Sequence, residues 1–488
     1  MDIWECRKKA LISQAKDLQT NLSDDSIQGQ LKDLIQCYIN YVDQHFILLH
    51  DGFFGSRGFR SSTEFPPEHV MHVTLNQAAY DLEVFERLIL QRVRSTNPSS
   101  DFLEIADFLA NEALKPANSL LGMAEENNTP AVFTYFHKSP LIRLIPYADV
   151  ALIGIPYTAA TCAKDLLAIP HEVGHYIFWH GNKIRNQSLV DDSIQNPIFA
   201  EIVERKNAGS PKDTAIILES ALYNWQEELF ADIYGSQIAG PFIALDWQDY
   251  QLRNNQETFE EDDGEHPTPA YRPNIYTIAA EDVWQTRLND LWEMKLSQRI
   301  TNRYWNQITL SLDINPQKFL SKMILDQAER EIVIQRLKRI NSTKNQFAPE
   351  TLNQRLSIFV TDIIQKYLST IQEENRNTIW GKIIDKTQNI YSPSAFTPEE
   401  LFGLLSAIVF PSETYDLDLS ELQNELVVGA TSYAQNRHPI SCIDYEVLKD
   451  QWVGKWSPTQ TLFNWPEWLP LFKADGWTTE GPSNPWTT

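Results

Sequence analysis

Residues 149–181 read DVALIGIPYTAATCAKDLLAIPHEVGHYIFWHG, and the fold prediction depends on this stretch. It begins with a short β-prone run and continues, from about Thr158, with apolar residues at helical spacing. Pro170 lies inside the predicted helix, and we expect it to bend the helix just before His171 because proline removes one backbone donor. The sequence therefore predicts a strand that is followed directly by a helix.

The predicted helix carries two histidines, His171 and His175, four residues apart. Residues at this spacing lie on one face of an α-helix, so both imidazoles can reach a single ion. Zinc accepts nitrogen ligands at about 2.0–2.1 Å. Glu172 points to the side of such an ion, where a bound water would lie. The pattern favours a metal site; the alternative is a buried helix whose two histidines are satisfied by hydrogen bonds.

A second predicted helix, over 213–239, offers a third ligand. Glu228 and Asp232 lie four residues apart on one of its faces, among apolar neighbours that disfavour a plain solvated surface. We predict that Glu228 completes a catalytic zinc site with one open position. Asp232 then accepts a hydrogen bond from the outer nitrogen of a ligand imidazole. Glu227 is the nearest competitor for the ligand role, but it lies about 100° away around the helix.

HEVGH (171–175) and EELFADIYG (227–235) together resemble the gluzincin group of zinc metallopeptidases, which pair an HExxH helix with a Glu-xxx-Asp helix. The resemblance spans about residues 145–275. It implies a small mixed sheet above the active-site helix, with an edge strand that holds extended substrate by main-chain pairing. DVALIGIPY (149–157) is well placed to be that strand, and a plain core strand is the alternative.

A further stretch, HPTPAYR (266–272), is similar to a segment that follows the third ligand in some gluzincin branches. The resemblance implies that it folds back over the site, where His266, Tyr271 or Arg272 would donate a hydrogen bond to the oxyanion of the tetrahedral intermediate. A proline-stiffened surface loop is the alternative. The related metzincin pattern does not fit, because it requires a glycine and a histidine where this chain has Phe178 and Gly181.

The whole chain predicts an α+β protein in which a zincin-like metallopeptidase core is embedded in large, mainly helical flanks. Its 488 residues exceed what one hydrophobic core usually supports. We assign a helical N-terminal region to 1–125, the core to 126–300, and a helical C-terminal region with a Trp-rich tail to 301–488. Two further β-prone runs, AVFTYFH (131–137) and LIRLIPY (141–147), fall within the predicted core.

Composition limits the classes of binding partner and the cellular location that we expect. A formal net charge of −24 disfavours nucleic acid and anionic membrane surfaces as partners. The chain has no apolar run of the roughly 18 residues that a membrane span needs, and no secretory signal is visible. Four widely spaced cysteines without a CxxC pair predict reduced, mostly buried thiols in a cytoplasmic protein: Cys6, Cys37, Cys162 and Cys442.

These features predict zinc-dependent hydrolysis of peptide bonds, with one Zn²⁺ per chain and a peptide or unfolded protein as substrate. Zinc lowers the pKa of its bound water toward about 7, and Glu172 takes the proton as general base. The alternative is a catalytically silent, peptidase-like scaffold that binds a protein or peptide. The sequence leaves the oligomeric state and the choice between endo- and exopeptidase action open.

Overall fold

The computed structural model describes residues 2–23, 26–55, 66–93, 99–121, 130–181, 227–251, 272–284, 360–361, 363–390, 398–410 and 418–446. These residues are mainly helical and include a three-stranded mixed sheet, in agreement with the α+β class. They belong to two compact units that interleave along the chain, whereas the three predicted regions are consecutive. Unit 1 contains Met1–Asn111, Glu125–Ala160 and Val427–Thr488, and unit 2 contains Glu112–Ala124 and Thr161–Leu426.

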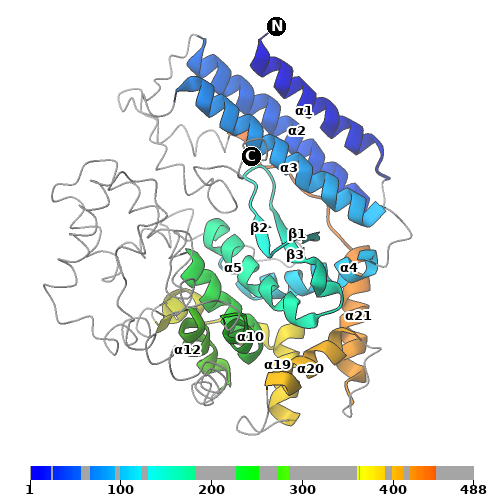
Figure 1. The fold of residues 1–488 in the computed structure, drawn as a ribbon, viewed down its shortest axis with the longest axis vertical. Helices are drawn as coiled ribbons and strands as arrows, with labels where there is room; N and C mark the ends of the chain where they lie inside the picture. The colour runs from blue at the N-terminus through cyan, green and yellow to red at the C-terminus, as the bar shows by residue number, and fades with distance from the viewer. Residues whose placement is uncertain are drawn as a thin grey trace, which may run out of the picture. The chain divides into compact units, whose positions relative to one another are not determined.

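Three long helices of unit 1 lie side by side: α1 (Ile3–Thr20), α2 (Ser26–Phe53) and α3 (Pro67–Val93) (Figure 1). All three lie in the N-terminal region, 1–125, that was predicted to be helical. Asp2 caps α1 by accepting a hydrogen bond from the backbone N–H of Trp4 at 3.2 Å. α4 (Ser99–Leu114) was also expected, and its last residues belong to unit 2.

The sheet of unit 1 consists of β1 (Ala131–His137), β2 (Leu141–Arg143) and β3 (Val150–Pro156), in the order β1-β3-β2. β3 pairs in parallel with β1 and antiparallel with β2. The three β-prone runs are therefore strands, but β3 is the central one. The expectation that it forms an edge strand for substrate was wrong, because β1 pairs along β3 on one side and β2 pairs with Leu152–Gly154 on the other. A strand buried on both faces reads as a continuous apolar run, as VALIGI does.

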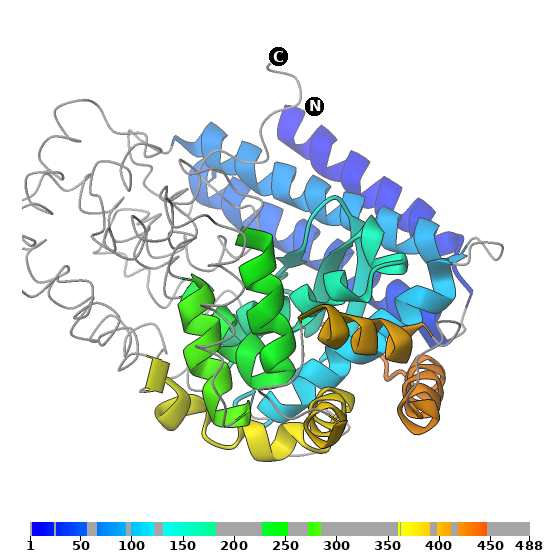
Figure 2. The ribbon, with the colours of Figure 1, turned by 60° about the horizontal axis from the view of Figure 1, so that its bottom comes forward.

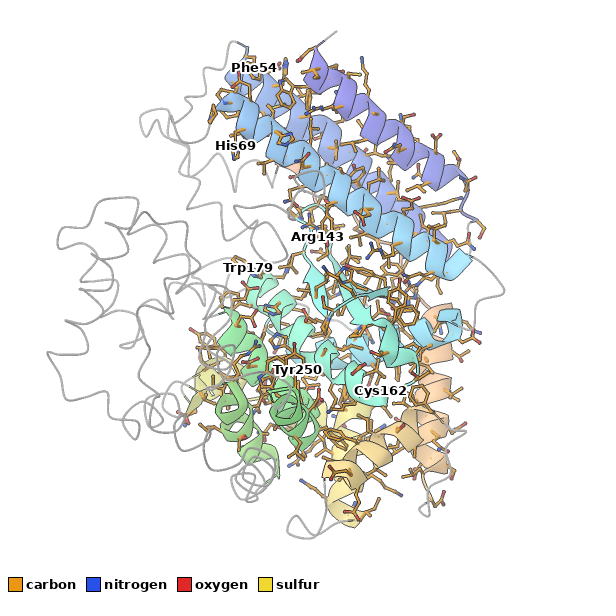
Figure 3. All side chains as sticks on the ribbon, viewed as in Figure 1. Phe54, His69, Arg143, Cys162, Trp179 and Tyr250 are labelled. Atoms are coloured by element: carbon orange, nitrogen blue, oxygen red, sulfur yellow. A yellow bond between two sulfur atoms is a disulfide. The ribbon has the colours of Figure 1, made fainter. Side chains whose placement is uncertain are left out.

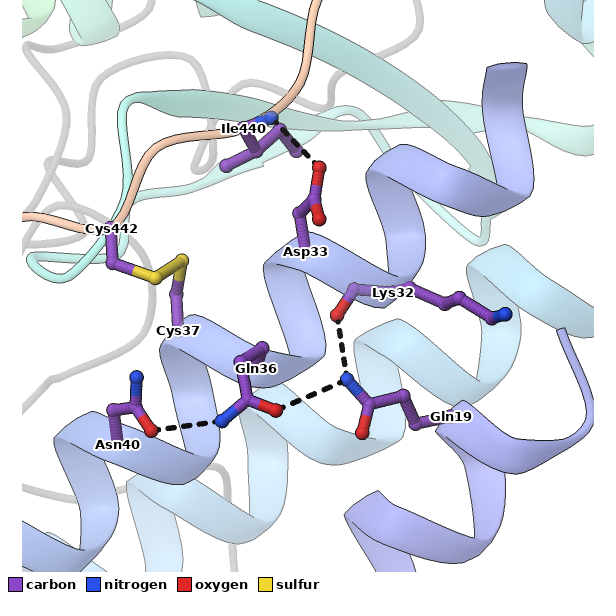
Figure 4. Close-up of a disulfide and its surroundings, with 8 residues drawn as sticks. All are labelled: Gln19, Lys32, Asp33, Gln36, Cys37, Asn40, Ile440 and Cys442. Carbon is purple, nitrogen blue, oxygen red and sulfur yellow. Dashed lines mark hydrogen bonds between the residues drawn. A yellow bond between two sulfur atoms is a disulfide. The ribbon is translucent and has the colours of Figure 1, made fainter. Parts of the chain in front are cut away.

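A disulfide in unit 1 links Cys37 of α2 to Cys442, which follows α21 (Ser420–Gln435), with the two Cα atoms 5.0 Å apart (Figure 4). The segment around Cys442 runs along α2, where the Ile440 N–H donates to Asp33 at 3.2 Å. The prediction of four reduced cysteines was therefore wrong. The partners are 405 residues apart in sequence, so only the tertiary fold reveals the pair. Cys6 and Cys162 are free thiols.

Unit 2 contains the histidine motif on α5 (Ala168–His180), which follows a short 3₁₀ turn, η4 (Ala163–Leu167). The structure thus replaces the single long helix expected from Thr158 by two 3₁₀ turns, the first of which is η3 (Tyr157–Ala160), and one α-helix. Pro170 lies in the first turn of α5, where no backbone N–H is needed for an intrahelical bond. The bend expected at Pro170 was wrong for this reason.

The acidic helix is described over 227–239 and ends at Gly240, as predicted. Gly240 has a φ of 55°, a left-handed conformation that favours glycine at the end of a helix. Pro241 then begins α10 (Pro241–Gln251). α10 and α12 (Arg272–Trp284), both green in Figure 2, pack beside each other, and both contribute residues to the site described below.

Unit 2 also contains these described elements: η1 (Lys115–Ala117), η5 (Ile364–Leu368), α18 (Ile371–Asn375), α19 (Ile379–Ile390), α20 (Pro398–Val409) and the first part of α21. Three predictions lie outside the described residues: His266, Tyr271 and the Trp-rich tail. None of the described helices is long and apolar enough to cross a membrane.

Candidate metal centre

Two closely packed helices build the candidate site. All residues from Ile169 to Phe178 of α5 are buried. A side-chain carbon added to Gly174 would lie 2.7 Å from the Cα of Ala231, so the helices meet at a distance that only glycine permits. The fixed backbone approach brings the histidines of α5 opposite the carboxylates of helix 227–239.

His171, His175 and Glu228 converge within this interface. The Nε2 atoms of His171 and His175 are 3.1 Å apart. Glu228 places Oε2 at 3.5 Å from Nε2 of His171 and Oε1 at 3.5 Å from Nε2 of His175. Ligand atoms about 2.0–2.1 Å from a tetrahedral ion are separated by about 3.3–3.4 Å. The three side chains therefore have the spacing of a metal-ligand set, and they form a group that could hold a metal ion.

A carboxylate lies at the outer nitrogen of each imidazole. Oδ1 of Asp232 is 3.1 Å from Nδ1 of His171, in the position predicted from the sequence. Oε1 of Glu227 is 2.7 Å from Nδ1 of His175. When each Nδ1–H donates to its carboxylate, the Nε2 lone pairs face each other and are available to a metal.

Tyr276 of α12 also reaches this site, with its hydroxyl 3.2 Å from Nδ1 of His171. Sequence reasoning missed Tyr276, which has no motif spacing to mark it. It considered Glu227 only as a rival ligand. A signal for Glu227 was present in the sequence. A ligand histidine needs a partner at its outer nitrogen, and Glu227 is next to Glu228, which faces His175.

Arg272 connects two of the acids. Its Nε and Nη2 atoms donate to the two oxygens of Asp232 at 2.9 and 2.7 Å. Nη2 also donates to Oε2 of Glu228 at 2.9 Å. The ring of Trp247 on α10 lies 4.3 Å from the guanidinium carbon. The structure thus places Arg272 on the carboxylates of the site, and its donation to an oxyanion stays a prediction.

Electrostatics at the site favour a cation. Burial works against the charged form of His171, but hydrogen bonds and charges from Asp232 and Glu228 outweigh it and raise its pKa to about 10. Burial likewise opposes the charged form of His175, yet the charge of Glu228 and the hydrogen bond of Glu227 raise its pKa. The carboxylates of Asp232, Glu228 and Glu227 outnumber the single guanidinium of Arg272 at this site. The surplus negative charge stabilises a proton on the imidazoles, and a metal ion can take its place.

Glu172, the predicted general base, lies on α5 directly after His171 and is 7% exposed. Figure 3 labels Trp179 on α5 and Tyr250 on α10, the helices that carry the two histidines and Trp247. No family model matches the chain, and no curated protein or solved structure is significantly similar to it.

Proposed function

We propose that the protein is a zinc-dependent peptidase of the gluzincin type with a zincin-like core. The observation that carries the proposal is the convergence of His171, His175 and Glu228 at 3.1–3.5 Å in a buried interface. Two imidazoles and one carboxylate are the protein ligands of many catalytic zinc sites, which keep a further position for water. Softer metals favour sulfur ligands, and calcium and magnesium favour oxygen ligands, so this donor set suits zinc or another first-row transition metal. The choice of zinc rests on the resemblance of the two motifs to gluzincins.

We assign the following roles to the protein groups. Zinc held by these residues supplies a Lewis acid and lowers the pKa of a water molecule toward about 7. Glu172 takes the proton of the attacking water and passes it to the leaving amine. Asp232 and Glu227 hold the two imidazoles in the tautomer that directs Nε2 to the ion.

The substrate in this proposal is a peptide or an unfolded protein. The support is the motif pairing of HEVGH (171–175) with EELFADIYG (227–235), together with a net charge of −24 that disfavours nucleic acid and anionic membranes. A substrate-pairing strand is not part of the proposal, since β3 has strand neighbours on both sides. The cysteines no longer support the proposed cytoplasmic location, because disulfides such as Cys37–Cys442 are rare in the cytosol.

Cleavage of an unbiased peptide mixture, measured beside zinc content, tests the proposal. Glu172→Gln should keep its zinc and its fold, while hydrolysis falls by about 10²–10⁴-fold because the general base is lost. Glu373→Gln, at an exposed position on α18, is the matched control and should cleave like the native protein. Full activity in the Glu172 variant would refute this mechanism. A native protein that holds zinc but cleaves nothing would instead be a silent, peptide-binding scaffold.

A further inference from the structure

The two carboxylate oxygens of Glu228 have different surroundings. Oε2 accepts a charge-assisted hydrogen bond from Nη2 of Arg272 at 2.9 Å. Both oxygens lie 3.5 Å from an imidazole nitrogen, Oε1 from Nε2 of His175 and Oε2 from Nε2 of His171, and the hydrogen bond from Arg272 falls on Oε2. A metal ion bonded to Oε2 would compete with this hydrogen bond for the same oxygen. Arg272 therefore favours a metal bond through Oε1.

Several contacts fix the position of Arg272 itself. Its fork binds both oxygens of Asp232, at 2.9 and 2.7 Å, and the Trp247 ring covers it at 4.3 Å. The side chain is buried, and such a bidentate pair has one preferred geometry. Asp232 also contacts Nδ1 of His171 at 3.1 Å, so Arg272 joins the orientation of the carboxylate ligand to that of the first imidazole.

We propose that Arg272 is a positioning residue that restricts Glu228 to a single metal bond through Oε1. A carboxylate that binds through both oxygens would take up the coordination position that a catalytic zinc leaves for water. Arg272 prevents this by holding Oε2. This inference rests on the proposed metal site and explains why an arginine, which repels a cation, lies among its ligands.

Cobalt(II) in place of zinc reports the coordination number, because four-coordinate cobalt absorbs visible light more strongly than five-coordinate cobalt. Arg272→Met removes both the charge and the fork, and Arg272→Lys keeps the charge but loses the fork. We expect both variants to lose at least about half of the visible absorption, and to bind metal about 10–100-fold more weakly. Arg376→Met, at an exposed position of unit 2, is the control and should match the native spectrum.

Native spectra in both Arg272 variants would overturn the proposal. So would a native spectrum in Arg272→Lys alone, because charge and not geometry would then be the cause. If the variants do not fold, X-ray absorption on the native zinc protein decides. One short carboxylate oxygen in a four-ligand shell is expected, and two oxygens from one carboxylate would contradict the inference. A native protein that takes up no cobalt would refute the metal site itself, a result distinct from these.

Discussion

Each unit of the molecule contains a buried cluster of charged side chains. The two clusters differ in which kind of charged group is in excess, guanidiniums or carboxylates. In unit 1, Asp107 accepts hydrogen bonds from Arg92 at 2.9 and 3.0 Å, from Thr134 Oγ1 at 2.7 Å, and from Arg437. Two guanidiniums surround this one carboxylate. In unit 2, the site around His171 holds three carboxylates and one guanidinium.

This difference separates a structural cluster from a candidate metal centre. The oxygens of Asp107 are saturated by donors, so they offer nothing to a cation. The second cluster has more acceptors than donors, and its imidazole nitrogens face each other at 3.1 Å. Buried charge is costly unless it is paired or binds a metal, so the excess of carboxylates in the second cluster points to a bound cation. Burial alone does not distinguish the two sites.

The largest effect is expected from breaking the cluster of unit 1. Asp107→Asn leaves two buried guanidiniums without their counter-charge and should lower the free energy of unfolding by about 3–5 kcal/mol. Zinc binding per folded molecule should not change. Urea unfolding with a zinc titration measures both, and Asp101→Asn, at an exposed position on α4, is the control. Loss of zinc affinity with unchanged stability would reverse the roles that we assign to the clusters.

Metal removal should give a slightly smaller effect, confined to unit 2. Zinc at 100–1,000 times its Kd adds about 2.7–4.1 kcal/mol to the stability of the state that binds it. Chelation should therefore increase amide hydrogen exchange in α5 and in helix 227–239, while α2 stays unchanged. Equal changes in α2, or none in α5, would contradict the placement of the metal.

A smaller effect is expected from the partner of His175. Glu227→Gln keeps the size of the side chain but weakens the hydrogen bond at 2.7 Å that orients the imidazole. Zinc affinity should fall by about 10–100-fold, the range typical of such outer partners. A competition titration with a chromophoric chelator measures the change, and Glu373→Gln serves as control. Affinity equal to that of the native protein would show that Glu227 does not position the ring.

The smallest effect concerns pH and unit 1. Burial lowers the pKa of His45 from 6.5 to about 3, so the folded state keeps this imidazole neutral where the unfolded state binds a proton. Its share of the stability is present above pH 6.5 and is lost as pH falls toward 3. Between pH 6.5 and 5.5 we expect a loss of about 1 kcal/mol. Unfolding curves of the native protein and of His45→Phe at several pH values measure this contribution, which should be missing in the variant. The same pH dependence of the free energy of unfolding in both proteins would contradict it.

Local patterns predicted much of the fold and of the site. The 131–137 run became β1 with the expected bounds, because β-prone residues next to turn signals describe a strand without further context. The four-residue spacing of His171 and His175 likewise places both imidazoles on one helix face, whatever the rest of the chain does. Glu228 could be named because a catalytic zinc needs a third ligand.

The features that sequence reasoning missed depend on tertiary contacts. Cys37 and Cys442 meet because residues far apart in the chain pack along α2, and no spacing rule connects them. The central position of β3 depends on strand order, which the apolar run does not encode. Tyr276 reaches His171 only through the packing of α12 in unit 2. The candidate site could therefore be predicted from local spacing, whereas connections between distant segments required coordinates.

Zinc stoichiometry by native mass spectrometry tests the central claim most directly. The native protein should carry one zinc ion per chain, and His175→Ala should carry none while it keeps its helical content. A native protein that binds no zinc, or a variant that retains it without His175, would contradict a site formed by His171, His175 and Glu228.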